Sequence, residues 1–225
     1  MRRFMLLGLT AIITLAGCAT APPSPFTAES GRTLRLDTVT VTVTVAVAPD
    51  AQLMWGNAEQ EFVNQKKAAG PLPKNKDIET GALGLQDSHS VDTAANAELI
   101  KSPEGQAYLR ERVTKRLAGA LDNKVKAQMN SGTRAVVLDV TVHSFVIPSA
   151  IQRVLIGGAP TISASAVLKD AKTGEVLAQR PNMLAAAFAG NGWGGVLVDQ
   201  VMDDLDVRVV DNYAEQYRQW LIPQG

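Results

Sequence analysis

The sequence holds few of the residues that most often carry chemistry. Among its 225 residues there are one cysteine and two histidines, and aromatic side chains make up 5%. A single thiol excludes an internal disulfide, so the stability of the fold has to come from packing. Two histidines and one cysteine also leave no zinc-binding set. With 22 basic and 22 acidic side chains the net charge is zero, which gives no electrostatic reason to expect binding to nucleic acid.

Long apolar runs are also scarce, and the one that stands out lies at the start of the chain. Arg2 and Arg3 precede the apolar residues 4–15, a stretch shorter than the ~20 residues that span a bilayer as a helix. The stretch closes with the residues Leu-Ala-Gly-Cys at 15–18. A short apolar core behind basic residues predicts an export signal. No comparable run follows, so we expect no transmembrane helix.

The end of this segment resembles the lipobox of bacterial lipoproteins. The resemblance implies that the chain is cut between Gly17 and Cys18, and that Cys18 carries a thioether-linked diacylglyceryl group and an acylated amine. An ordinary secretory signal and an uncleaved anchor with an unrelated cysteine are the alternatives. Ala19, and not an aspartate, follows the cysteine. By resemblance to enterobacterial lipoproteins this favours the inner leaflet of the outer membrane, with the domain in the periplasm.

This interpretation divides the chain into three regions. Residues 1–17 are the signal peptide, and residues 18–33 are the lipidated N-terminus and a flexible tether, rich in proline and small residues. Residues 34–222 form a single periplasmic domain, which is large enough to bury a core. Within that domain, residues 49–101 largely lack an apolar period. They predict a long irregular loop with a short helix at about 57–67.

The rest of the domain predicts an α+β fold. Valine and threonine alternate over 38–47, which predicts a strand with one buried face. Apolar residues recur at every fourth position between the helix start at Ser102 and the helix end at Gly132. A strand over 135–148, a hairpin over 162–188 that turns at Gly174, and a helix over 195–221 follow. This order favours an antiparallel sheet of about four strands, with two amphipathic helices packed on one face, plus the long irregular loop.

The C-terminal half carries a second resemblance. It rests on the Val-His-Ser-Phe of the strand 135–147, the Ile-Gly-Gly at 156–158, and the Asp-Ala-Lys-Thr-Gly-Glu-Val-Leu at 170–177. These features resemble alphaproteobacterial lipoproteins of unassigned function and, more distantly, the auxiliary lipoproteins of envelope transport systems. The resemblance covers mainly residues 130–222. It implies a lipoprotein domain, and it supplies no catalytic residues.

Two motifs invite an enzymatic interpretation, and neither has the context that its chemistry needs. Residues 190–195 match G-x-G-x-x-G, but no carboxylate follows at the end of a second parallel strand ~20 residues on. A close-packing loop, whose amides at a helix start could hold an anion, is the favoured interpretation. Asp139 and His143 share one face of a strand ~13 Å apart, too far to pair, and the Asp-Ser-His at 87–89 lies in the long loop. We therefore predict no catalytic residue, no cofactor and no metal.

Two charged stripes are open to more than one interpretation. An acidic cluster at the start of the last helix predicts a solvated face favoured by the helix dipole, or less readily a calcium site; it consists of Asp199, Asp203, Asp204 and Asp206. A basic stripe on the first long helix could contact anionic lipid or glycan, face the acidic last helix, or stay solvated. Its members are Arg110, Arg112, Lys115, Arg116, Lys124 and Lys126.

Together these features favour a lipid-anchored envelope lipoprotein with a non-enzymatic structural, assembly or transport-accessory role. Its expected partners are the membrane, through the lipid, and a protein of the cell envelope. A periplasmic binding module for a lipid or small apolar ligand is the alternative, and a hydrolase comes third. We expect partner contact on the polar face of the sheet and on the glycine-rich loop, at Thr42, Thr141, Gly192 and Trp193.

Overall fold

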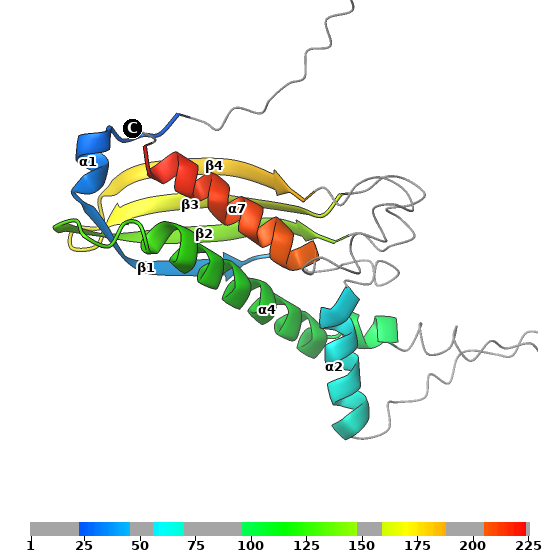
Figure 1. The fold of residues 1–225 in the computed structure, drawn as a ribbon. Coiled ribbons are helices and arrows are strands. Elements are labelled where there is room, and N and C mark those ends of the chain that lie inside the picture. The colour runs from blue at the N-terminus through cyan, green and yellow to red at the C-terminus, as the bar shows by residue number, and fades with distance from the viewer. Residues whose placement is uncertain (1–22, 46–55, 70–95, 148–158, 188–204, 224–225) are drawn as a thin grey trace, which may run out of the picture.

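A four-stranded sheet with helices on one face organises the protein (Figure 1). The computed structural model describes residues 23–45, 56–69, 96–147, 159–187 and 205–223. The elements in chain order are α1 (Ala28–Arg32), β1 (Leu34–Val43), α2 (Gly56–Ala69), α4 (Pro103–Leu121), the π-helical turn η1 (Asp122–Lys126), β2 (Arg134–Val146), β3 (Thr161–Asp170), β4 (Val176–Ala186) and α7 (Leu205–Leu221).

The strands lie in the order β1-β2-β3-β4, and the predicted α+β class with four strands is confirmed. β2, β3 and β4 are antiparallel neighbours, as predicted. β1 differs from the prediction because it runs parallel to β2. A parallel neighbour requires a crossover connection of a dozen residues or more, usually helical. The chain meets this requirement by running back along α4 between the two strands (Figure 1).

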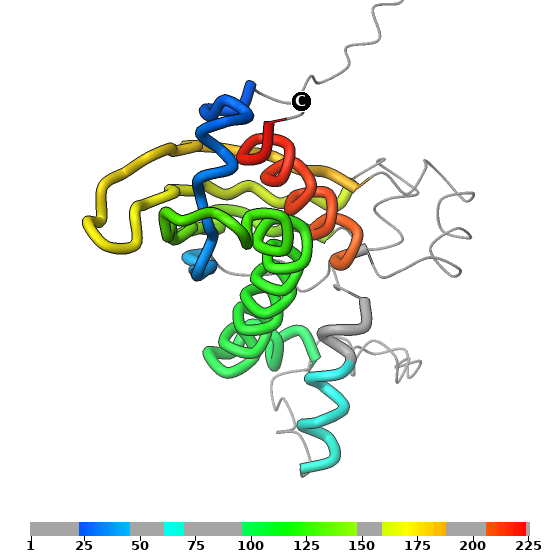
Figure 2. The backbone as a smooth tube through the Cα atoms, turned by 60° about the vertical axis from the view of Figure 1, so that its left-hand side comes forward, coloured from blue at the N-terminus to red at the C-terminus, as the bar shows by residue number. Residues whose placement is uncertain are grey.

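The inner face of the sheet is the core. α4 and α7 lie side by side on this face (Figures 1 and 2), and the strands alternate buried and accessible residues beneath them. The predicted inward positions of β2 and β3 are all buried, namely Val136, Leu138, Val140, Val142, Ile162, Ala164, Ala166 and Leu168. The helices contribute their predicted apolar stripes, of which the described members are Leu109, Val113, Leu117, Leu121, Val125, Met129, Val209, Tyr213, Tyr217 and Trp220.

α4 begins where the sequence predicts and ends for a different reason. Ser102 caps it by accepting a hydrogen bond from the backbone N–H of Gly105 at 3.1 Å, with proline in the first turn. The wider turn of η1 follows and keeps Val125 in the core. Gly132 stands close to β1, because a Cβ added there would lie 2.3 Å from the carbonyl of Leu34. Close backbone contact, not a left-handed conformation, therefore requires the glycine.

The N-terminal tether is shorter than predicted. Residues 28–32, expected to be unstructured, form α1, because Thr27 and Ser30 complete a capping box at its start. Gly31 lies against Pro223 near the C-terminus: a Cβ at this position would be 3.2 Å from the proline Cδ. The prediction of a flexible tether up to residue 33 is therefore wrong for this last part.

The predicted long loop also contains packed structure. α2 confirms the short helix expected near residues 57–67, and Phe62 and Val63 are buried in the core. The Phe62 ring lies 5.0 Å from the Tyr108 ring, measured between centroids, which joins α2 to α4. Residues 70–95 lie outside the described part of the chain. No helix among the described residues is long and apolar enough to cross a membrane.

The one-sided core can be tested with two matched substitutions. Val140→Asp places a carboxylate on the inner face, where Val140 is buried, and we expect the free energy of unfolding to fall by at least ~3 kcal/mol. Thr42→Asp introduces the same group on the exposed outer face and should cost less than ~1 kcal/mol. Chemical denaturation of both variants measures the difference. Equal losses would contradict a sheet that buries only one face.

Candidate interaction surface

The outer face of the sheet is the candidate site. The alternation that buries apolar residues on the inner face turns polar ones outward, and α4 and α7 both lie on the opposite side (Figure 1). Strand pairing brings these outward residues into cross-strand rows. The rows are Thr38, Val137, Lys169 and Val176; Thr40, Asp139, Val167 and Gln179; Thr42, Thr141 and Ser165; and Ser144, Ser163 and Leu184.

Polar contacts tie the outer rows together. Lys169 Nζ lies 2.8 Å from Asp139 Oδ2, across the β2–β3 pair. His143 Nε2 lies 2.8 Å from Ser165 Oγ on the same two strands. On exposed strand faces each such pair contributes roughly 0.2–1 kcal/mol. The outer face is therefore an ordered polar surface, on which Lys169 and Asp139 balance each other's charge.

The predicted triad residues are separated. Asp139 faces Lys169, whereas His143 faces a serine that the sequence did not single out, so Asp139 and His143 do not pair. The expected separation of the two along one strand is thus confirmed. Strand register alone brings Ser165 to His143, and no local sequence signal reports it. The residues at 87–89 lie outside the described part of the chain.

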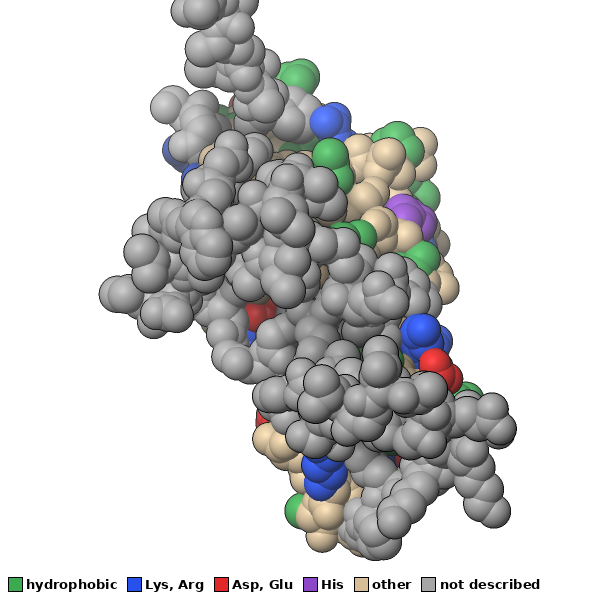
Figure 3. Space-filling view, turned by 90° about the vertical axis from the view of Figure 1, so that its right-hand side faces the viewer, with side chains coloured by type: hydrophobic (Ala, Val, Ile, Leu, Met, Phe, Trp, Pro, Cys, Tyr) green, Lys and Arg blue, Asp and Glu red, His purple; other side chains and the backbone are tan. Residues whose placement is uncertain are grey.

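An apolar pair interrupts the polar rows at the end of the sheet away from α1. Leu184 is 63% exposed and Val146 is 36% exposed, on adjacent outward rows of the sheet. Figure 3 looks onto this end and shows separate hydrophobic side chains among uncharged polar atoms. The alternation of β4 could have identified Leu184, because Met183 and Ala185 on either side of it are buried. β3 lies between the strands of these two side chains, so they mark this end of the outer face without forming one contiguous patch.

The predicted contact residues fall into two groups. Thr42 is exposed and Thr141 is partly exposed, and strand pairing places them next to each other on the outer face. Gly192 and Trp193 lie outside the described residues, in the connection between β4 and α7. Gly17 and Cys18, the predicted cleavage and lipidation residues, lie outside them as well.

Five of the six residues of the basic stripe, which runs along α4 and η1, form ion pairs within the domain. Arg116 pairs with the buried Asp206 at the start of α7, and Lys124 lies 3.7 Å from Asp211 on the same helix. Contact with the acidic last helix is therefore confirmed for Arg116 and Lys124, whereas Lys115 is solvated, with 75% of its side chain exposed. Arg112 pairs with Glu61 of α2, and the remaining contacts are within the helix: Lys115 with Glu111 and Lys126 with Asp122. Asp199, Asp203 and Asp204 lie outside the described residues.

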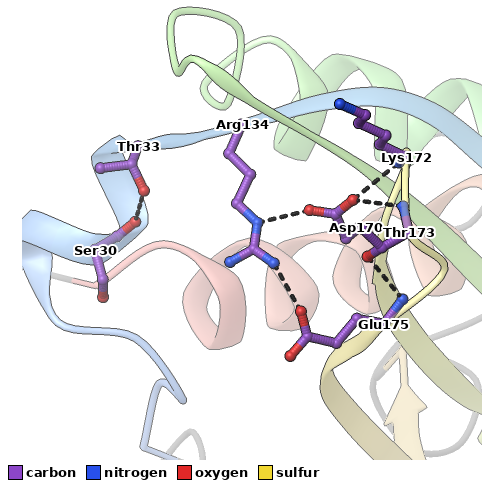
Figure 4. A network of polar contacts seen from close by, with 7 residues as sticks. All are labelled: Ser30, Thr33, Arg134, Asp170, Lys172, Thr173 and Glu175. Carbon is purple, nitrogen blue, oxygen red and sulfur yellow. Dashed lines mark hydrogen bonds and ion pairs between the residues drawn. The ribbon is translucent and has the colours of Figure 1, made fainter.

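A polar network holds the end of the sheet nearest to α1 (Figure 4). The Asp170 carboxylate accepts a hydrogen bond from Arg134 Nε at 2.7 Å and from the backbone N–H groups of Lys172 and Thr173, each at 2.9 Å. The guanidinium of Arg134, followed by these two amides, holds the pKa of Asp170 well below its usual range. Gly174, with φ of 75°, supplies the left-handed position that the predicted turn requires.

A cleft lies beside α1. Its volume is about 280 Å³, and it lies between α1, the start of β1 and the C-terminal residues. Leu34, Met129 and Leu221 form apolar walls, and Arg32 and Gln128 are polar residues of the lining. The lipid-binding alternative predicted a pocket between the sheet and the long loop, so this cleft lies elsewhere.

Comparisons with known proteins identify related shapes only distantly. No family model matches the chain, and no curated protein matches it. A candidate lipoprotein from Caulobacter crescentus CB15 is 17% identical over 50% of this chain and 86% of its own, with a TM-score of 0.31. A lipoprotein from Neisseria meningitidis is 17% identical over 75% of this chain and 94% of its own, with a TM-score of 0.25. The dodecameric PelC of Paraburkholderia phytofirmans is 11% identical over 85% of this chain and 92% of its own, with a TM-score of 0.32. Lipoproteins are thus among the structural neighbours, and none of these matches establishes a function.

The Asp170 network makes a pH-dependent contribution to stability. Because folding lowers the pKa of Asp170, the contribution is complete above the pKa of an unfolded aspartate, about 3.9, and is lost as the pH falls toward the folded value. We expect Asp170→Asn to lower the melting temperature at pH 7. The difference in melting temperature between the variant and the unsubstituted protein, which is the gap to be measured, should shrink below about pH 4. Asp122→Asn, which alters an exposed carboxylate 3.7 Å from Lys126, is the control. A gap that is the same at pH 2.5 and pH 7 would refute this role of Asp170.

Proposed function

We propose that the protein is a lipoprotein of the outer membrane, anchored in the inner leaflet through Cys18, whose domain contacts an envelope protein through the outer face of its sheet. The anchor is supported by the lipobox-like residues 15–18 behind a short apolar core and two arginines. Ala19 supports the outer membrane over the inner one. The role is structural, assembly-related or transport-accessory and not enzymatic.

The observation that carries the partner contact is the outer face of the sheet, which no described helix covers. A sheet with one buried face exposes the other, and here that face is ordered by cross-strand pairs and carries the exposed Leu184 and Val146. α1 is the first described helix after the anchor: residues 19–22 separate Cys18 from Pro23 and span at most about 15 Å when extended. We propose that the opposite end of the sheet, where Leu184 lies, faces periplasmic partners, because the chain enters the sheet at the α1 end.

One observation favours a second function. The cleft beside α1 has apolar walls and a volume of about 280 Å³, and Arg32 in its lining could pair with an anionic headgroup. A protein that binds a lipid or small apolar ligand would use this cleft. Native mass spectrometry of the purified protein separates the two functions, because a co-purifying lipid favours the ligand-binding one.

The anchor has a direct test. We expect Cys18→Ser to abolish acylation, because serine cannot form the thioether, and the uncleaved precursor should accumulate. Phase partitioning into detergent and the intact mass of the protein measure both effects. A Cys18→Ser protein that is still cleaved and acylated would show that the lipoprotein assignment is wrong.

The contact surface can be mapped in cells. We expect photoreactive residues at Thr42, Thr141 and Leu184 to cross-link one specific partner, because these positions lie on the outer face. Trp193, in the connection between β4 and α7, is a fourth position for which we expect the same result. Arg112 on α4 is the control on the helix side, Asp203 in the connection before α7 is a second control, and mass spectrometry identifies the products. Capture of a specific partner only from the control positions would refute outer-face contact.

A further inference from the structure

The two edges of the sheet differ in how open they are. β4 carries Arg180 and Pro181, and its pairing with β3 is irregular there, since Ala164 pairs with Met183 and Ala166 with Arg180. Proline, charge and a bulge are the usual devices that keep other strands from adding to an edge. β1 has none of these between Thr38 and Val43, where threonine and valine alternate.

Backbone directions along β1 follow from two hydrogen bonds. The N–H of Thr44 donates to the carbonyl of Val142 at 3.2 Å, so it points toward β2. In a parallel pair alternate residues direct both N–H and C=O to the same neighbour. The backbone N–H and C=O groups therefore point to β2 at Thr38, Thr40 and Thr42. Those of Val39, Val41 and Val43 point to the free edge.

The start of the same edge confirms this direction. The N–H of Leu36 points away from β2 and donates to the carbonyl of Met129 at 2.7 Å. One extra residue between Leu36 and Thr38 then shifts the alternation, as the register shows. Among the described residues, none forms a backbone hydrogen bond with the outward groups of Val39, Val41 and Val43. The side chains of these valines are only partly buried although they pack against the core.

The arrangement of α4 determines which occupant fits this edge. α4 crosses β1 and continues past the edge of the sheet (Figure 1), and Figure 2 shows it extending away from the strands. If the β1 edges of two copies paired antiparallel, directly opposed residues would point to the same face of the joined sheet. Both copies of α4 would then lie on that face and extend across the shared edge. A second copy of the chain is therefore a poor occupant. An extended segment without its own helix layer meets no such obstacle.

We infer that the β1 edge binds an extended segment of an envelope partner by strand addition, with the valine backbone groups as its hydrogen-bonding row. The segment continues the sheet, and its apolar side chains lie on the helix side, next to Val39, Val41 and Val43. Main-chain hydrogen bonds supply affinity in this mode, and side chains on alternate positions supply specificity. This inference deepens the proposed function, on which it rests for the location of the partner.

A peptide that can bind along one edge only tests the inference. The probe is Lys-Thr-Val-Thr-Val-Thr-Val-Lys with N-methylated threonines, so that only the valine amides donate and the peptide cannot stack on itself. The control peptide carries N-methyl groups on the valines as well as on the threonines, so none of its six central amides can donate a hydrogen bond. We expect the first peptide to slow hydrogen exchange at the amides of Val39, Val41 and Val43 of the full-length protein by on the order of tenfold or more, and the control peptide to have no effect.

Matched proline substitutions test the direction of the backbone. Val41→Pro removes an N–H that pairs with no described backbone group, so we expect it to abolish peptide protection at Val39 and Val43 while the melting temperature changes by only a few degrees. Val41→Thr keeps the N–H and should bind as the unsubstituted protein does. Thr40→Pro removes a ladder hydrogen bond to β2 and should lower the melting temperature much more.

Several outcomes would overturn the inference. The inference is wrong if both peptides protect the valine amides equally, or if the first peptide protects β4 instead of β1. It is also wrong if Val41→Pro binds the peptide as well as the unsubstituted protein does. If the three valine amides of the peptide-free protein already exchange as slowly as those between β2 and β3, another part of the chain or a second copy fills the edge, and the inference is also wrong. The measurement depends neither on acylation nor on the outer face, so its failure is distinct from a failure of the proposed function.

Discussion

Burial of one sheet face beneath α4 and α7 is the interaction on which the rest of the structure depends. Without internal disulfides, the domain is held by this layer of apolar packing, and most outward positions on the central strands carry polar residues. The same packing brings charged residues of the helices into contact, since Arg116 pairs with the buried Asp206 and Lys124 lies near Asp211. The outer face of the sheet and the edge of β1 are the surfaces that we propose for partner contact.

The two ends of the sheet differ in their contacts and in their exposed side chains. At the α1 end, backbone contact at Gly132 and the Arg134–Asp170 pair bring β1, β2 and the hairpin together close to the predicted anchor. At the other end, Leu184 and Val146 are exposed on the outer face. The proposed lipid would therefore hold the well-braced end near the membrane and leave the apolar end accessible. In this proposal, anchoring and partner contact lie at opposite ends of the strands.

Local patterns in the sequence were sufficient to predict much of the fold. The alternation of β2, the stripe from Leu109 to Met129, the cap at Ser102 and the turn at Gly174 each depend on neighbours within one element, and the structure confirms them. α1 was missed because a tether rich in proline and small residues masks the short capping box at Thr27. For the candidate site, the sequence predicted that Thr42 and Thr141 face outward, but not that they are neighbours.

By itself, the sequence determined which residues are apolar, at which period they recur, and hence which face of each strand and helix is buried; it also determined the lipobox-like start. Only the tertiary structure decided how the strands are paired. The parallel direction of β1, the contact between His143 and Ser165, and the open backbone groups at Val41 all arise from residues far apart in the chain. A period of two specifies the side to which a residue points, but not the strand that lies beside it, because hydrogen bonding between backbones is the same for every sequence.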